Sequence, residues 1–270
     1  MNNLDINNPY NAPVFHEETV SSTMDVSRQL AADNAPHGTV ITADLQESGR
    51  GRIQGRKWEM ERGNLPFTII LRYPRLEEIP EAITLRAGLA VSLAIEDFAP
   101  SLKGKVFVKW PNDIIIDSKK AAGILCEAND GVVHLGIGLN AAQREFPEHL
   151  RGKAISVAIA ANKEPLSDNG KKEMRWLLLE KILLRLYDEL ENKRYAKCWK
   201  ERLEQRLYKK GEQVVFVQGA AGSGREVCGL LAGIGKDGEL LILPDGESEA
   251  RGFFSGEIGF AAILSNSQFH

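Results

Sequence analysis

The sequence predicts an α+β protein, in which a mixed, largely antiparallel sheet packed with helices is followed by a small β-rich domain. Three observations lead to this fold class. Short β-branched runs alternate with two helical patterns up to about residue 100. Between residues 106 and 140, four such runs follow one another across tight turns, which is typical of an antiparallel meander. Beyond residue 210 the chain changes to short strands broken by glycines.

The first hundred residues are expected to supply three strands and two helices. Residues 1–13 are rich in Asn and Pro and predict a loose tail or surface strap. Ser22 or Thr23 can cap a helix that runs to Ala32, because a hydroxyl oxygen accepts a hydrogen bond from a first-turn N–H group. A second helix is expected over residues 81–98, where apolar and small residues recur at helical spacing. The expected strands cover residues 14–20, 39–45 and 65–71.

The remainder of the chain is expected to complete the sheet, add two helices and end in the β-rich domain. Turns are predicted at residues 111–113 and 129–131, where Pro, Asn, Asp and Gly gather. An amphipathic helix is expected over residues 171–190, and one further helix over 194–208, which ends before Gly211. The meander strands are expected at 106–110, 114–116, 121–128 and 132–140, and those of a small barrel or sandwich at 214–217, 226–231, 239–243 and 250–253. The predicted units are a tail (1–13), a large domain (14–210) and a C-terminal β domain (211–270).

Composition sets limits on the class of protein. The chain has 270 residues, 43% hydrophobic and 26% charged, with a formal net charge of -3 and a pI near 6.0. It therefore lacks the global basic field that drives sequence-independent DNA binding. Three distant cysteines, Cys126, Cys198 and Cys228, predict buried free thiols and not disulfides or a zinc site. The start of the chain lacks a signal-peptide pattern, and no apolar run approaches the ~20 residues that span a bilayer, so we expect a cytoplasmic protein.

Several familiar motifs are absent or occur in the wrong context. Residues 233–238 match the letters of a dinucleotide-binding fingerprint, but a strand follows them where that motif needs a helix, so Asp237-Gly238 is interpreted as a hairpin turn. The five histidines show no ligand spacing, which argues against a histidine metal site. No phosphate-binding P-loop and no GxSxG nucleophile motif occur.

One basic segment, Gly49–Trp58, combines three glycines and four cationic side chains with no acid. Glycine lets the backbone approach a ligand closely, and arginine binds phosphate or carboxylate through two parallel hydrogen bonds. This glycine-arginine loop lies between two expected strands, which would anchor its ends in a sheet. Composition alone favours the alternative of a basic surface loop or a nucleic-acid patch.

A second cluster, Lys109-Trp110-Pro111-Asn112-Asp113, is followed closely by Lys120. Taken singly, each residue has a structural interpretation: the tryptophan as core, Asn-Asp as a turn and the lysines as solvated side chains. Their occurrence together, beside a loop suited to anions, favours a binding site.

These segments, in this order, resemble biotin protein ligases. The resemblance rests on the glycine-arginine loop, on Lys109–Asp113, on Lys120 with Gly123–Leu125, and on Gly136–Asn140. It covers residues 14–140 strongly and the later segments more loosely. It implies a catalytic domain like that of class II aminoacyl-tRNA synthetases, followed by an SH3-like β-barrel. Residues 1–13 are too few for a helix-turn-helix, so we expect the form of the family that lacks an N-terminal DNA-binding domain.

The resemblance implies a two-step reaction. Biotin and MgATP would form biotinyl-5′-adenylate and pyrophosphate, and the biotinyl group would pass to one lysine of a biotin carboxyl carrier protein or domain. DNA and membranes are not expected partners, and sheet edges in such a fold can pair two chains as a homodimer. The alternatives are a lipoate-type ligase, a biotin-binding homologue without transfer activity, and a nucleic-acid-binding module.

The resemblance also suggests roles for particular residues. Lys120, with Arg50 and Arg52, would offset the charge of the reacting carboxylate and α-phosphate. Magnesium would be held mainly by the ATP phosphates, with Asp113 as a contributing ligand. The family usually has the pattern GRGRxGRxW, and this chain has one residue more between Arg52 and Gly55. The residues expected to contact biotin are Ser22, Thr23, Gln46, Gly49, Arg50, Gly51, Arg52, Lys120, Gly123 and Gly136. Those expected to contact ATP or the adenylate are Arg52, Arg56, Trp58, Lys109, Asn112, Lys120 and Asn140.

Overall fold

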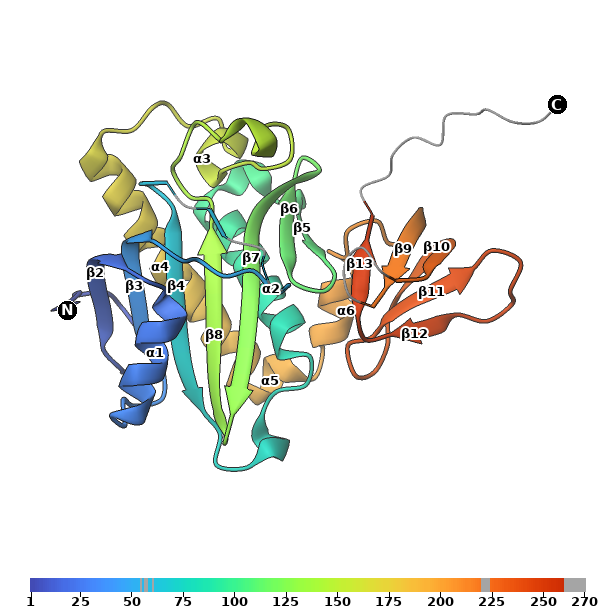
Figure 1. Cartoon of the computed structure of the whole chain (residues 1–270), viewed down its shortest axis with the longest axis horizontal. Helices are drawn as coiled ribbons and strands as arrows, with labels where there is room; N and C mark the ends of the chain where they lie inside the picture. The colour runs from blue at the N-terminus through green and yellow to red at the C-terminus, as the bar shows by residue number, and fades with distance from the viewer. Residues whose placement is uncertain (54, 56–57, 60, 220–223, 260–270) are drawn as a thin grey trace.

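The computed structural model describes residues 1–53, 55, 58–59, 61–219 and 224–259, and its larger part is built on an eight-stranded sheet (Figure 1). The strand order is β1-β2-β3-β4-β8-β7-β6-β5. Strands β2 and β3 pair in parallel, and the other neighbouring pairs are antiparallel. The mixed, largely antiparallel sheet is thus confirmed. Its strands are β1 (Asn2–Asn3), β2 (Val14–Val20), β3 (Thr39–Gln46), β4 (Leu65–Arg72), β5 (Val106–Lys109), β6 (Asp113–Ile116), β7 (Lys119–Asn129) and β8 (Val132–Leu139).

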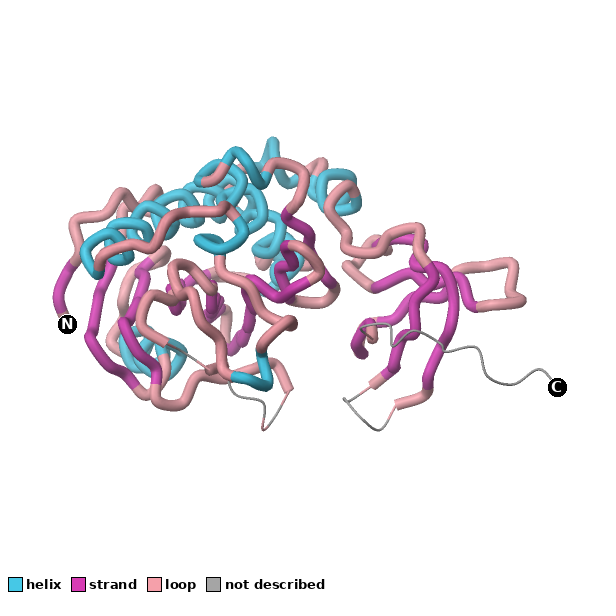
Figure 2. The backbone as a smooth tube through the Cα atoms, turned by 90° about the horizontal axis from the view of Figure 1, so that it is seen from above, coloured by secondary structure: helices cyan, strands magenta, loops and turns pink. Residues whose placement is uncertain are grey.

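Helices cover both faces of this sheet. Helix α1 (Thr23–Ala32) lies on one face, and α2 (Ile83–Phe98) and α4 (Asp168–Leu190) pack together on the other (Figure 2). The core forms where α2 and α4 bury their apolar stripes against the strands, for example at Leu89 and Ile182. Short helical segments complete the larger part: α3 (Val157–Ala160), α5 (Lys193–Ala196), α6 (Trp199–Glu204) and the 3-10 turns Leu76–Glu78, Pro100–Leu102 and Glu148–Leu150.

The N-terminal residues are a strap and not a loose tail. Asn2 and Asn3 pair with β2 as the edge strand β1. The buried Asn8 amide donates to the carbonyl oxygens of Ala12 at 2.8 Å and Gly38 at 2.9 Å. These bonds hold the strap along the β2 edge of the sheet.

The single helix expected over residues 194–208 is wrong. Cys198 leaves helical geometry at φ -120 and ψ 23, which separates α5 from α6. After α6 the chain joins the sheet edge, where the Val108 N–H donates to the Arg206 carbonyl at 2.8 Å and the Tyr208 N–H donates to the Val108 carbonyl at 2.9 Å. Helical periodicity continues there in the sequence, but hydrogen bonds to the open edge of β5 replace those of another helical turn.

The C-terminal part is an antiparallel sheet in the order β12-β11-β10-β9-β13. Asp237-Gly238 forms the turn between β10 and β11, as expected. The expected barrel is not closed by the strand pairings of the described residues, which leave β12 and β13 as the two edges. The predicted domain bounds stay a prediction. The strands are β9 (Gln213–Gln218), β10 (Glu226–Ile234), β11 (Leu240–Pro244), β12 (Arg251–Phe253) and β13 (Gly256–Ile258), of which β13 was not expected.

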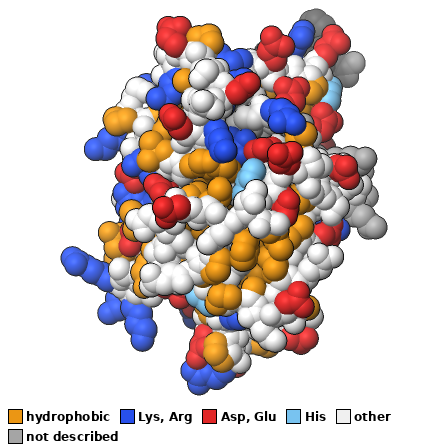
Figure 3. Space-filling view, turned by 90° about the vertical axis from the view of Figure 1, so that its left-hand side faces the viewer, with side chains coloured by type: hydrophobic (Ala, Val, Ile, Leu, Met, Phe, Trp, Pro, Cys, Tyr) orange, Lys and Arg blue, Asp and Glu red, His pale blue; other side chains and the backbone are white. Residues whose placement is uncertain are grey.

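Surface features correct one expectation. The three cysteines are free thiols, but Cys198 and Cys228 are exposed and Cys126 is half-buried, so the expected burial is wrong. On the face that carries the N-terminus, acidic and basic side chains are interspersed around a group of hydrophobic ones, with no field of one sign (Figure 3). Among the described helices, none combines the length and the apolar character that crossing a bilayer would need.

Candidate active site

Two adjoining cavities open where the start of α1, the end of β3 and the hairpin β7–β8 meet. Gln46, Trp58 and Lys120 line both cavities. The smaller cavity also collects the predicted residues Ser22, Thr23, Arg50, Gly51, Arg52, Asn112, Gly123 and Gly136. The larger one collects Gly49, Asp113 and Asn140. Residues predicted from segments far apart in the sequence are therefore brought together.

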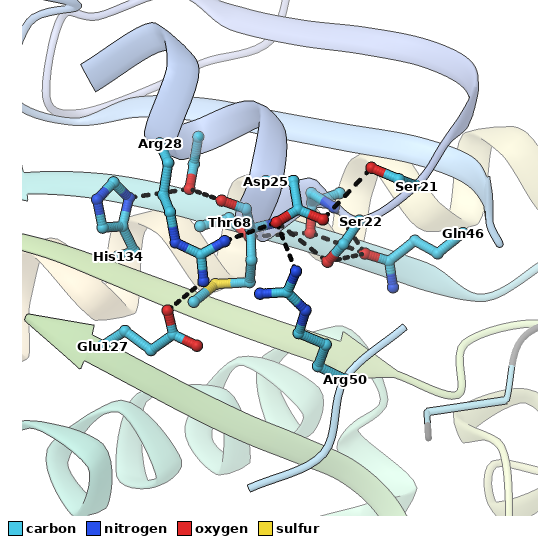
Figure 4. Close-up of polar contacts among 12 residues, drawn as sticks. Ser21, Ser22, Asp25, Arg28, Gln46, Arg50, Thr68, Glu127 and His134 are labelled. Atoms are coloured by element: carbon cyan, nitrogen blue, oxygen red, sulfur yellow. Dashed lines mark hydrogen bonds and ion pairs between the residues drawn. The ribbon is translucent and has the colours of Figure 1, made fainter. Parts of the chain in front are cut away.

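A polar wall, made of Ser22, Thr23 and Gln46, forms one side of the smaller cavity, and the buried Thr68 supports it through Thr23 (Figure 4). The Thr68 hydroxyl donates to the Thr23 hydroxyl oxygen at 2.8 Å, and the Thr23 hydroxyl donates to Gln46 Oε1 at 3.0 Å. The Thr23 backbone N–H also donates to Gln46 Oε1 at 2.8 Å. A backbone N–H can only donate, so the amide oxygen of Gln46 must face α1 and its nitrogen must point the other way.

Ser22 belongs to this wall because it caps α1. Its hydroxyl oxygen accepts from the Met24 N–H at 3.3 Å, as an N-cap does. The side chains of Ser22, Thr23 and Thr68 are all buried. The same turn therefore begins the helix and places polar groups at the cavity.

A glycine platform, made of Gly123, Gly136 and Gly138, forms the floor. Gly123 on β7 pairs directly with Gly138 on β8. A Cβ atom at Gly138 would lie 2.6 Å from Cε2 of Trp58, and one at Gly136 would lie 2.8 Å from Sδ of Met24. Side chains at these positions would displace the indole and the thioether, so the ring of Trp58 depends on glycine to lie flat against the sheet.

Trp58 is the last residue of the glycine-arginine loop. The backbone N–H of Trp58 donates to the Gly49 carbonyl at 3.0 Å, which joins the two ends of the loop. Its Nε1 atom is buried and has no hydrogen-bond partner among the described residues. A donor in that state, beside a cavity, is suited to a ligand acceptor.

Lys120 lies where the two cavities meet, and a β-bulge places it there. Residues three apart on a regular strand face opposite sides, yet Nζ of Lys120 would lie 3.3 Å from a Cβ atom at Gly123. The pairing of β6 with β7 shifts between Ile114 and Ile115, which inserts one extra residue in β7. Lys120 and Gly123 therefore face the same side of the sheet. Lys120 Nζ lies 2.7 Å from Asp113 Oδ1 and 5.5 Å from the ring centroid of Trp58.

Lys109 is buried near the charged side chains of Asp113, Lys120 and Glu257. Burial lowers its pKa to about 8, although the nearby Asp113 and Glu257 favour its charged form. Asn112 and Asn140 support the backbone: Nδ2 of Asn112 donates to the Ile124 carbonyl at 2.7 Å, and Nδ2 of Asn140 donates to the Lys120 carbonyl at 3.2 Å. Both asparagines thus hold the strand that carries Lys120.

The arginines of the loop are held on two sides. Nη2 of Arg50 lies 2.6 Å from Oδ1 of Asp25 on α1. Nη2 of Arg52 donates to the Gly256 carbonyl at 3.2 Å and lies 3.6 Å from Oε1 of Glu257, so it reaches β13 of the C-terminal sheet. Arg56 lies outside the described residues.

Sequence reasoning missed Thr68, Asp25 and Gly138 as parts of this site. Gly138 lies inside the Gly136–Asn140 run, so the run already pointed to it. Thr68 lies within an apolar strand, and Asp25 looks like an ordinary first-turn acid of a helix. Neither of these two carries a local signal.

The sequence of the chain matches a protein-family model and several known proteins. A model of the biotin/lipoate A/B protein ligase family matches residues 17–141. The bifunctional ligase/repressor BirA of Bacillus subtilis is 34% identical over 160 residues, which cover 56% of this chain and 48% of that protein. The biotin–[acetyl-CoA-carboxylase] ligase of Mycobacterium tuberculosis is 32% identical over 145 residues, 52% of each protein. The chain thus spans about half the length of these curated relatives.

The three-dimensional comparison extends over nearly the whole chain. A biotin protein ligase from Aquifex aeolicus, solved in complex with biotin and ATP, has a TM-score of 0.74 and 30% sequence identity. The match covers 91% of this chain and 97% of that one.

Proposed function

The chain belongs to the biotin protein ligase family, and from that premise we propose that it activates biotin with ATP and transfers it to a carrier protein. Biotin and ATP would give biotinyl-5′-adenylate and pyrophosphate, and a lysine amine of the carrier would then displace AMP. One observation carries the proposal: the ammonium group of Lys120 lies where a cavity with a polar wall meets a second, larger cavity.

The polar wall suits the ureido end of biotin. A ureido group offers two N–H donors and one carbonyl acceptor, and the wall offers hydroxyls that both donate and accept, with the amide of Gln46. The glycine platform and Trp58 would bound the apolar ring and chain. This arrangement would direct the carboxylate of the acid towards Lys120.

Lys120 would act as the electrostatic catalyst. The carboxylate of biotin must approach the α-phosphate of ATP, so two anions are forced together, and a cation between them lowers the energy of the transition state. Arg50 and Arg52 would add positive charge at the mouth of the smaller cavity. Trp58, Lys109, Asn112 and Asn140 would hold the adenylate, directly or by supporting the backbone.

A magnesium ion fits the site only as an ion held mainly by ATP. Among the described residues, no three His, Cys, Asp or Glu side chains gather as a ligand set. Asp113 lines the larger cavity beside Lys120, and one carboxylate is enough for Mg²⁺ that takes its other ligands from phosphates and water. Bound there, the ion would neutralise phosphate charge.

The proposed protein partner is a biotin carboxyl carrier protein or domain. The name of the Mycobacterium tuberculosis relative points to acetyl-CoA carboxylase as the source of such a carrier. A cytoplasmic location and a homodimer paired through sheet edges stay predictions from the sequence.

The polar wall also favours biotin over lipoate. The dithiolane ring of lipoate has no hydrogen-bonding group to offer the wall. The ureido group of biotin can exchange hydrogen bonds with these hydroxyls and this amide, so the site offers biotin contacts that lipoate cannot make. Biotin is therefore the preferred acid.

Isotope exchange between labelled pyrophosphate and ATP tests the proposal. Exchange that depends on biotin and not on lipoate is the expected result. Exchange with lipoate alone would replace the substrate. Absence of exchange with either acid, with biotin still bound in equilibrium dialysis, would favour a binding protein without ligase activity.

A further inference from the structure

Asp25, in the first turn of α1, joins the glycine-arginine loop to the helix. Its Oδ1 atom accepts from Nη2 of Arg50 at 2.6 Å and from Nη1 of Arg28 at 2.6 Å (Figure 4). The other oxygen, Oδ2, lies 3.4 Å from the Ser21 hydroxyl. A single carboxylate thus connects the loop, the helix and the turn that precedes the polar wall.

Arg28 orients this carboxylate. Nη2 of Arg28 also donates to Oε2 of Glu127 on β7, so its guanidinium bridges two acids. The four groups alternate in sign, in the order Glu127, Arg28, Asp25, Arg50. Because Arg28 contacts both acids, it helps to hold the carboxylate of Asp25 in place independently of Arg50.

Backbone contacts hold the main chain at and beside Arg50, which forms an isolated β-bridge next to the bond between the Trp58 N–H and the Gly49 carbonyl at 3.0 Å, but they leave the direction of its long side chain open. Hydrogen bonds fix the entrance of the loop, where the N–H groups of Glu47 and Ser48 donate to the carbonyls of Val20 and Ser21 at 3.0 and 2.8 Å. Arg50 then lies between two glycines, Gly49 and Gly51, whose backbone is less restricted than that of other residues. The ion pair with Asp25 directs that side chain and fastens it to the helix.

We propose that Asp25 is a positioning residue that holds Arg50 across the mouth of the smaller cavity and so slows the escape of the activated acid. The identity of that acid rests on the proposed function. Side chains of 30% and 43% exposure form the pair, so solvent screens it and its role is geometric more than energetic. An effect of about fivefold on ligand release is the size that such a pair provides.

Release of preformed biotinyl-5′-adenylate, chased with unlabelled biotin and ATP, measures this effect. We expect Asp25→Asn to release the adenylate about fivefold faster and Asp25→Glu to restore slow release in part. The KM for biotin should rise with kcat little changed, because Asp25 touches no reacting atom. Asp33→Asn removes an acid from the far end of the same helix and should release at the normal rate.

A double-mutant cycle separates positioning from simple support of the helix. If Asp25 acts through Arg50, Asp25→Asn should add nothing to the release rate of Arg50→Met. Multiplied effects in the double variant, or normal release by Asp25→Asn, would overturn the proposal. Thermal unfolding of each variant checks that the fold is kept.

Hydrogen exchange of the ligand-free chain separates the failure of this inference from failure of the proposed function. Peptides that cover residues 46–53 should exchange faster in Asp25→Asn than in the normal chain or in Asp33→Asn. This readout needs neither biotin nor turnover. Equal exchange in all three chains would refute the positioning role even if the chain proves to be a biotin ligase.

Discussion

Lys120 shows how much a single side chain depends on its local backbone. Its N–H donates to the Lys153 carbonyl at 2.8 Å, and its carbonyl accepts from the Ile155 N–H at 3.0 Å and from the amide of Asn140. With the bulge in β7, these bonds hold the ammonium group between the cavities before any ligand binds. Preorganised charge of this kind costs no rearrangement when the transition state forms.

Replacement of Lys120 by Ala should therefore impair chemistry more than binding. We expect biotin affinity to stay within a few fold and the rate of adenylate formation to fall by about 100-fold to 1,000-fold, the usual effect of removing one electrostatic donor. Rapid-quench measurement of adenylate, with equilibrium dialysis for biotin, gives both numbers. Lys119→Ala, at the neighbouring position, is the matched control. Normal turnover of Lys120→Ala would show that the role is assigned to the wrong residue.

Lys109 gives a prediction about pH and stability. Burial lowers its pKa to about 8 in the folded chain, whereas a lysine in the unfolded chain titrates near 10.4. Between these values the unfolded chain binds more protons, so the contribution of Lys109 to stability rises with pH. Urea unfolding across pH 7 to about 10.5 should show this rise in the normal chain relative to Lys109→Met.

Comparing Lys109→Met with the normal chain also cancels the effect on stability of other groups that titrate in this pH range. Burial raises the pKa of Cys126 to about 11, which lowers stability over part of the same range, but it does so in both chains. Lys103→Met, at an exposed position, should follow the normal chain. A constant difference between Lys109→Met and the normal chain would contradict the prediction.

At the scale of elements, two arginine-carboxylate pairs fasten α6 and the residues after it to the main helices. Arg202 binds the carboxylate of Glu189 on α4 through both Nη atoms, and Arg206 binds Glu96 on α2 at 2.5 and 2.9 Å. Glu189 is only 1% exposed. The short helix that leads to the C-terminal sheet is thus fixed by charge as well as by packing.

Loss of Arg202 should be costly, because it would strand a buried carboxylate. We expect Arg202→Met to lower the free energy of unfolding by about 3 kcal/mol. Denaturant unfolding of this variant and of Arg194→Met, which removes an exposed arginine from α5, measures the difference. A loss below about 1 kcal/mol, as for an exposed pair, would show that Glu189 finds other partners.

The helices and strands also show which features could be predicted from the sequence and which could not. The expected strands and the helices α1, α2 and α4 are confirmed because their periodicity and caps are local properties. The end of α6, after which residues 206–208 pair with β5, and the bulge beside Lys120 depend on pairing with distant strands, which local sequence patterns do not reveal. Asp25 is likewise ordinary in sequence, and only the approach of Arg50 and Arg28 gives it a role.

At the scale of the whole molecule, the two sheets meet through Trp110 and the glycine-arginine loop. Nε1 of Trp110 donates to the Gly238 carbonyl at 3.0 Å, and its ring centroid lies 5.9 Å from that of Phe216. Arg52 makes a second connection at Gly256. The candidate active site therefore borders on both parts of the molecule.

Trp110→Phe should loosen this connection while keeping an aromatic ring. We expect the free energy of unfolding to fall by about 1–2 kcal/mol and amides of the 234–239 turn to exchange faster, because the Gly238 carbonyl loses its donor. Trp176→Phe makes the same ring change in α4 and should leave that turn unaffected. Unchanged exchange at the turn would indicate that Arg52 and packing hold the two parts without this bond.

The bulge in β7 also determines which changes in chain length the site accepts. Deletion of Ala121 would restore a regular pleat and turn Lys120 to the opposite face of the sheet, even though every proposed ligand-binding side chain remained in the sequence. The glycine-arginine loop, by contrast, lies between β3 and β4, which pair with each other at residues 39–42 and 67–70. The site therefore depends on the number of residues in β7 as much as on their identity.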